Sequence, residues 1–110
     1  PAEGSAEAAA RVAAARVIQE KRYASLGLPH VTTNAAAPAH IIEQVAMLDS
    51  AATALVRDAA ERMHLSARGF HRVLKLARTL ADLDHAERTG RIHLAEALSY
   101  RGNSAMRTAA

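Results

Sequence analysis

The stretch Leu65–Arg101 reads LSARGFHRVLKLARTLADLDHAERTGRIHLAEALSYR, and its spacing decides the fold. Apolar side chains recur at the interval of one helix face, at Phe70, Val73, Leu74, Ala77, Leu80 and Ala81. The opposite face is polar and mostly basic, with Arg68, His71, Arg72, Lys75, Arg78, Thr79 and Asp82. Ser66 is a good N-cap, because its hydroxyl can accept a free backbone amide of the first turn. We therefore expect a helix from Ser66 to about His85 with one core face and one solvated basic face.

The first turn of this helix contains two locally unfavourable residues. A cation such as Arg68 costs about 0.3–1 kcal/mol at the positive end of the helix dipole, and Gly69 costs up to about 1 kcal/mol relative to Ala. An anion bound at the helix start would explain both, since amides and a guanidinium would point at it and glycine would let it approach. The plain alternative is an exposed arginine whose stem covers its neighbours. Spacing alone leaves both interpretations open.

Three more helices are expected earlier in the chain, over Ser5–Ala24, Pro38–Val45 and Ser50–His64. Gly27 suits a left-handed position after the first of them, and Pro29 prevents its continuation. Residues 30–37 read as a loop, Pro38 suits the first position of a short helix, and Asp49 is a plausible N-cap. The apolar positions expected to face inward are Val12, Ala15, Val17, Ile18, Ile41, Ile42, Val45, Ala52, Leu55, Val56, Ala59 and Met63.

A last helix is expected after a turn around Ala86–Gly90, running to about Tyr100 and packing through Leu94, Ala97 and Leu98. The Gly102–Ser104 stretch reads as a stop, and residues 1–5 and 102–110 are expected to be mobile. A chain of 110 residues suffices for one modest core. The prediction is an all-α protein: a single domain spanning residues 1–110, built as a small four- to five-helix bundle.

Composition and motifs argue against several classes of site. The chain has no Cys, and the pairs His93/Glu96 and Asp82/His85 supply two ligands each where structural zinc needs four, so no metal site is expected. His71 and His93 are expected to make polar contacts or to be partly buried in the core. No GxSxG or GxxxxGK[ST] motif is present, so we expect no catalytic residue in this chain and no enzyme in the chain by itself. No apolar run is long enough for a membrane span, and a cytoplasmic location is expected.

The charge balance bears on partners. The formal net charge is +3, and all but two of the 14 basic residues other than histidine are arginine. Arginine matches phosphate with bidentate geometry, so nucleotide or nucleic-acid phosphate is one interpretation. The other interpretation is a surface without a specific partner, on which arginine is frequent only because the composition favours it.

Three blocks of the sequence carry a family resemblance: SARGFHRVL at Ser66–Leu74, ARTLADL at Ala77–Leu83 and HLAEALSYR at His93–Arg101. Together they resemble the C-terminal domain of the magnesium-chelatase-like AAA+ ATPases, the YifB/ComM group of bacterial competence proteins. The match is dense over these blocks and continues more weakly back to about Val12. The resemblance implies that the bundle is the helical lid that follows an α/β nucleotide-binding core, and thus a fragment of a larger ATPase.

The resemblance also implies roles. Arg68 occupies the place of the sensor-2 arginine, which would reach the γ-phosphate of ATP across the cleft between lid and core, with Ser66, Gly69 and Arg72 as candidate cleft or subunit contacts. ATP and Mg²⁺ would be held mainly by the core of the same chain. Neighbouring subunits of a homo-oligomeric ring would be partners, and DNA would be handled by the whole ring.

Two other classes of function compete with this one. The first is a nucleic-acid-binding helical module that tracks phosphates with Arg68, Arg72, Lys75 and Arg78 on the Ser66–His85 helix. The second is a structural oligomerisation domain. For Arg78 the sequence offers a salt bridge with Asp82 four residues later. No role is assigned from the sequence to the arginines of the first helix, Arg11, Arg16 and Arg22.

Overall fold

The computed structural model describes the backbone of residues 4–109 and the side chains of residues 4–100. In this part of the chain the elements are α1 (Ser5–Ser25), η1 (Asn34–Ala36, a 3-10 helix), α2 (Ala39–Val45), α3 (Ser50–Arg62), α4 (Ala67–Leu83) and α5 (Arg91–Ala109). The prediction of a small all-α bundle is confirmed. The predicted mobility of both ends stays a prediction, and residues 1–3 and 110 lie outside the described residues.

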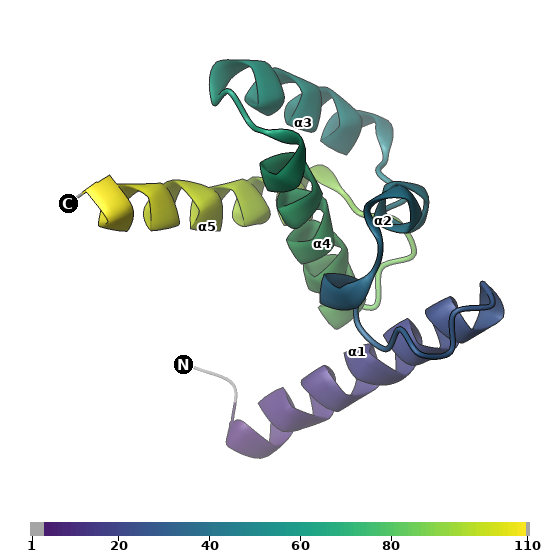
Figure 1. The fold of residues 1–110 in the computed structure, drawn as a ribbon. Coiled ribbons are helices and arrows are strands. Elements are labelled where there is room, and N and C mark those ends of the chain that lie inside the picture. Colours follow the sequence, from purple (N-terminus) through teal and green to yellow (C-terminus); the bar gives the residue numbers. More distant parts are fainter. Residues whose placement is uncertain (1–3, 110) are drawn as a thin grey trace.

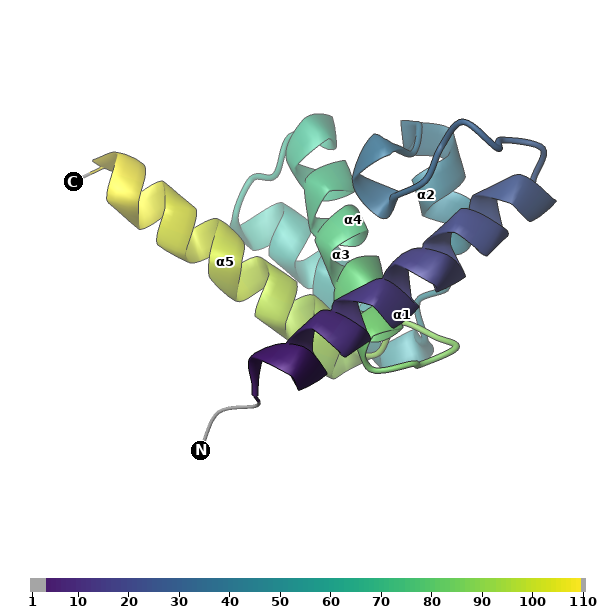
Figure 2. The same ribbon diagram turned by 90° about the horizontal axis from the view of Figure 1, so that it is seen from below.

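Helix α4 is the centre of the bundle, and the other elements are arranged around it (Figure 1). It packs against α1, η1, α2 and α5, while α3 packs on α5. Both views show α1 crossing the C-terminal end of α4, and Figure 2 shows α5 leaving the bundle at an angle to α1. The stretch that decides the fold in sequence therefore also supplies the helix on which the others pack.

Two apolar clusters lie against α4. One is built by α1, the following loop and α2, and it takes Leu74 from α4; its other buried members are Tyr23, Val31, Ala37, Ile42, Val45 and Ala46. The second joins α3, α4 and α5 through Ala52, Val56, Val73, Ala77, Leu94 and Ala97. The apolar stripe predicted for α4 is confirmed, since all of its members are buried or half-buried.

Three predicted core positions are exposed instead. Val12 is 44% exposed, Val17 49% and Met63 40%. Helix α1 buries a different face, made of Ala15, Gln19 and Tyr23 at intervals of four residues. A polar residue can lie in that face because its side chain bonds to another element, which the apolar pattern of one helix cannot show.

The predicted helix caps are largely confirmed. Ser66 and Asp49 are N-caps whose side chains accept from Gly69 N and Ala52 N. Gly27 has a φ of 79°, and the amides of Gly27 and Leu28 bond back to the carbonyls of Ala24 and Tyr23, which is a Schellman motif. Pro38 is the N-cap of α2 and not its first helical residue.

Three predicted helix ends differ from the structure. Helices α3 and α4 end two residues early, at Arg62 and Leu83, because His64 and His85 take left-handed φ values of 51° and 56°. Helix α5 does not stop at about Tyr100 but continues to Ala109. The expected stop was wrong because glycine or asparagine in a helix costs about 1 kcal/mol or less, whereas proline costs about 3 kcal/mol.

Candidate functional site

The start of α4 is an exposed helix end with an arginine in its first turn. Ser66 Oγ accepts a hydrogen bond from Gly69 N at 3.0 Å, which satisfies one of the free amides there. The amides of Ala67 and Arg68 lack an intrahelical acceptor, as in any first helical turn. Ser66 is exposed, whereas Gly69 is buried. The contact roles predicted for Ser66 and Gly69 stay predictions.

The side chain of Arg68 is exposed, and no hydrogen bond or ion pair joins it to any side chain or carbonyl of residues 4–100. Arg72, one turn further along α4, is likewise exposed and unpaired within the described residues. Like charges four residues apart on a helix repel by about 0.2–0.5 kcal/mol. Two unpaired arginines thus share one face of α4 near a helix end that itself disfavours positive charge.

The other basic residues on α4 are engaged within the domain. His71 Nε2 lies 2.5 Å from Glu43 Oε2 of α2, in line with the polar contact expected for this histidine. Lys75 Nζ donates to the carbonyl of Ala35 in η1 at 3.0 Å. These contacts tie α2 and η1 to α4 and separate the pair of free arginines from the rest of the basic face.

The sequence placed Arg78 and Asp82 on a solvated face, and that prediction was wrong. Both side chains are 1% exposed, although the predicted ion pair between them is present at 3.0 Å. Arg78 also donates to the carbonyls of Ala86 at 2.7 Å and Glu87 at 3.0 Å. Burial lowers the pKa of the Arg78 guanidinium, and the charge of Asp82 partly offsets that effect. Arg78 is therefore not available to bind phosphates in a nucleic-acid-binding surface on α4.

The residue that covers Asp82 comes from α1, 60 positions earlier in the chain. Arg22 grips the carboxylate with two hydrogen bonds, Nη1 to Oδ2 at 2.9 Å and Nη2 to Oδ1 at 2.6 Å. Burial by itself would raise the pKa of Asp82, but the bonds from Arg22 and Asn34 and the charge of Arg78 outweigh it, so the pKa lies below its ordinary value. The bond to Asp82 raises the pKa of Arg22.

Asn34 completes this buried network and connects three elements. Its side-chain amide donates to Asp82 Oδ2 and Thr79 Oγ1, both at 3.0 Å. Its carbonyl oxygen accepts from Tyr23 OH at 2.6 Å and from Arg22 Nη1 at 3.1 Å. Its backbone amide donates to Gln19 Oε1 at 2.9 Å. We call the set Gln19, Arg22, Tyr23, Asn34, Arg78, Thr79 and Asp82 the Asp82 network.

Sequence reasoning missed most of this network. Gln19 and Tyr23 share a helix face with Ala15, so a spacing signal existed in α1. That signal identifies a face but does not identify Asp82 as the group that the face covers. Asn34 lies in a segment that read as a loop, where a polar residue carries no burial signal.

His93 makes the polar contacts expected of it. Its Nδ1 accepts from Gly90 N at 3.0 Å, and its Nε2 lies 2.8 Å from Asp84 Oδ2. A ring nitrogen that accepts carries no proton, so the other nitrogen is the donor to Asp84. His93 thus takes the place of the glutamate in a capping box at the start of α5. Among the described residues, no cluster of three or more His, Cys, Asp or Glu side chains could hold a metal ion.

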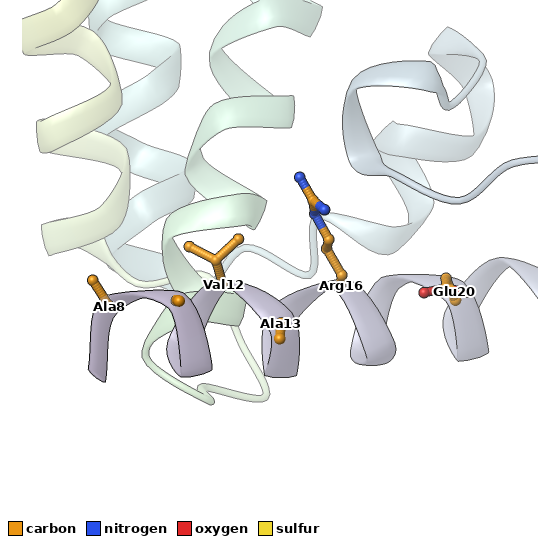
Figure 3. A pocket seen from close by; sticks show the side chains of 6 residues that line it. Ala8, Val12, Ala13, Arg16 and Glu20 are labelled. Carbon is orange, nitrogen blue, oxygen red and sulfur yellow. The ribbon is translucent and has the colours of Figure 1, made fainter. Parts of the chain in front are cut away.

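A depression elsewhere on the surface runs along α1 (Figure 3). It is lined by Ala8, Ala9, Val12, Ala13, Arg16 and Glu20. Figure 3 shows Val12 and Arg16 extending from α1 toward the bundle. None of the candidate residues at the start of α4 contributes to it. The helices of the described part are each too short or too polar to cross a bilayer.

Comparisons with known proteins agree with the resemblance seen in the sequence. The family model described as magnesium chelatase, subunit ChlI C-terminal, matches residues 2–101. The uncharacterized protein YifB of Escherichia coli is 39% identical over 101 residues, which cover 92% of this chain and 19% of YifB. The competence protein ComM of Haemophilus influenzae is 34% identical over 99 residues, covering 90% of this chain and 18% of ComM. The chain thus spans about a fifth of these relatives. No solved structure matches it significantly.

Proposed function

This chain belongs to the family of magnesium chelatase subunit ChlI C-terminal domains, and from that membership we propose that it is the helical lid of a magnesium-chelatase-like AAA+ ATPase. The lid works with a nucleotide-binding core in the same chain, and that core holds ATP and Mg²⁺. One relative is named as a competence protein, and we propose a cytoplasmic, DNA-processing, homo-oligomeric ring as the full assembly. The full-length protein is then an ATPase, while this domain supplies no catalytic residue.

Within the lid, Arg68 is the nucleotide-sensing residue. The observation that carries this assignment is that Arg68 is exposed at the start of α4 without a partner among the described residues. A structural arginine would resemble Arg78, which is buried with its nitrogen atoms bonded inside the bundle. Arg68 instead keeps its guanidinium available to a group outside the domain.

The electrostatics at the start of α4 favour an anion as that group. The helix dipole and the repulsion from Arg72 both raise the energy of Arg68 in the isolated domain. A phosphate reverses both effects, because it attracts the two guanidinium groups and accepts from the free amides of the first turn. Ser66 and Arg72 are the exposed neighbours that can share this contact, and the buried Gly69 follows Arg68 in the first turn.

The role of the lid follows from what changes when ATP is hydrolysed. Arg68 contacts the γ-phosphate, so this contact exists with ATP and is lost with ADP. A ligand shifts a conformational equilibrium only by its differential contact with the two states. Loss of the contact therefore biases the hinge between lid and core toward its open position.

The test is Arg68→Ala in the full-length protein. We expect ATP turnover to fall at least about tenfold, which corresponds to about 1.4 kcal/mol of lost stabilisation. Arg57→Ala is the matched control, because Arg57 is an exposed arginine on α3, and it should leave turnover unchanged. Wild-type turnover in Arg68→Ala would refute the sensing role, and a change in the fold of that variant would assign Arg68 to structure.

A further inference from the structure

We propose that the Asp82 network positions Arg68, so that Arg22 and Asp82 act in nucleotide sensing from the opposite end of α4. This inference rests on the proposed function, in which Arg68 contacts the γ-phosphate. It adds that the orientation of α4 against α1 determines whether Arg68 reaches that phosphate. Arg22 and Asp82 are positioning residues in this account, because they act through Arg68.

The interface between α1 and α4 combines directional bonds with the apolar packing of Tyr23 and Leu74. Helix α1 packs chiefly on α4, yet its two valines remain about half exposed. The contact at the C-terminal end of α4 is the bidentate pair of Arg22 with Asp82, and Asn34 donates a further hydrogen bond to the same carboxylate. A bidentate pair fixes an angle as well as a distance, whereas apolar surfaces can slide past one another.

Every strong acceptor position of Asp82 is used. Its two oxygens accept from Arg22, from Asn34 and from Arg78 Nε at 3.1 Å. The Arg78 guanidinium continues to the carbonyls of Ala86 and Glu87 in the connection to α5. The network therefore fixes α4 relative to α1 on one side and to the start of α5 on the other.

Helix α4 carries this constraint to Arg68. Arg68 and Asp82 lie 14 residues apart on one unbroken helix, which is a distance of about 21 Å along the axis. A tilt of about 10° at the Asp82 end would move the Arg68 end by about 4 Å over that length. A misplacement of about 1 Å in an active site can cost about a hundredfold in rate. A small change of angle at the Asp82 network therefore causes a large displacement of Arg68 relative to the phosphate.

Arg22 is the residue with which to test this, because its removal leaves the core paired. The side chain of Arg22 is 18% exposed, and without it Asp82 keeps its bonds to Arg78 and Asn34. Arg22→Met preserves most of the length of the stem and removes the guanidinium with its bonds to Asp82 and Asn34. The surface pair Arg62 and Asp58 on α3 supplies the matched control, Arg62→Met.

The experiment measures the ratio of ATP to ADP affinity in the full-length protein, with both nucleotides titrated in the same preparation. We expect Arg22→Met to reduce the preference for ATP by about fivefold or more, at the low end of typical coupling between sites. Arg22→Lys, which keeps the charge but not the bidentate grip, should fall between, and Arg62→Met should match the wild type. A purely structural role would lower the active fraction for both nucleotides and leave the ratio of dissociation constants unchanged.

The double variant Arg22→Met with Arg68→Ala tests whether Arg22 affects nucleotide binding only through Arg68. Its ATP preference should equal that of Arg68→Ala alone, because Arg22 has nothing left to position. Additive losses, or a wild-type ratio in Arg22→Met while Arg68→Ala has lost its preference, would overturn the positioning role and leave the proposed function intact. A wild-type ratio in Arg68→Ala would overturn both.

Discussion

At the scale of single residues, the arginines of this domain divide by what their guanidinium groups can reach. Arg78 is enclosed, and its nitrogen atoms bond to a carboxylate and to backbone carbonyls. Arg22 is partly covered and pairs with the same carboxylate. Arg68 and Arg72 are exposed and unpaired within the described residues. The surroundings of each arginine therefore determine its role. Arg78 forms hydrogen bonds in the core, Arg22 links two helices, and Arg68 and Arg72 are candidates for binding a ligand.

Asp82 makes the stability of the domain depend on acidity. Its pKa lies below the ordinary 3.8, so the unfolded chain takes up the proton first as the pH falls. The stabilisation by Asp82 is therefore fully present above the unfolded-state pKa and is lost as the pH falls through the folded-state value. Urea unfolding at a series of pH values should show a free energy that decreases below about pH 5, where carboxylates begin to titrate.

A matched pair of variants isolates this effect. Asp82→Asn should lose about 3–5 kcal/mol at neutral pH, because it leaves two arginines around an uncharged group, and its remaining stability should depend less on acid. Asp58→Asn breaks the exposed pair with Arg62 and should change stability by about 0.5 kcal/mol or less. An acid dependence that is the same in Asp82→Asn and in the wild type would contradict the assignment.

At the scale of elements, three helices end in the same way with different residues. Helices α1, α3 and α4 are each followed by a residue with positive φ, namely Gly27, His64 and His85. In each case the two residues after the C-cap bond back to carbonyls of the last turn. Histidine adopts this conformation more readily than most residues but at a cost that glycine avoids. Glycine at position 27 therefore predicts the end of α1. Histidine at the equivalent positions gives no such signal, and the predicted ends of α3 and α4 are two residues too late.

Substitutions at these positions should have opposite signs. Gly27→Ala should destabilise the domain by about 1 kcal/mol through the backbone alone, since a Cβ at Gly27 would meet no atom within 4 Å. His85→Gly should stabilise it by about 0.5 kcal/mol, the relief of left-handed strain less the entropy lost by glycine. Thermal unfolding of both variants is the measurement. A loss of stability in His85→Gly would mean that its side chain contributes contacts.

At the scale of the whole molecule, the domain consists of two apolar clusters with α4 between them and a polar network at one end of α4. The second cluster joins α3, α4 and α5 through apolar side chains. The C-terminal half of α1 is held by the Asp82 network and by Tyr23 in the first apolar cluster. The first half of α1 is mostly exposed. Local stability follows the density of buried contacts, so α1 is expected to open more easily than α4.

Native-state hydrogen exchange tests this difference. Backbone amides of residues 5–14 should exchange fastest among the helical amides of residues 5–100, and those in the middle of α4 slowest. Arg22→Met should extend the fast exchange along the rest of α1 while α4 keeps its protection. Equal protection along α1 and α4 would show that the domain opens as one unit and that the network does not control α1 separately.

The sequence alone determined the class of fold, the centre of the bundle and most helix boundaries. Apolar periodicity reports the buried face of each helix, and caps such as Ser66, Asp49 and Gly27 act within a few residues of their own position. The family resemblance carried by residues 66–101 was likewise readable, and the family match confirms it. These properties depend on neighbours along the chain.

Only the tertiary structure decided which polar residues are buried. Arg78 and Asp82 lie on the polar face of α4, and one helix considered by itself predicts that such a face is solvated. They become core residues because Arg22 and Asn34, 60 and 48 positions away in sequence, bond to the carboxylate. Burying a charge is costly unless its partners are in place, and partners from distant segments meet only in the folded chain. The same fold leaves Arg68 exposed, and that difference separates Arg68 from Arg78 on the same helix.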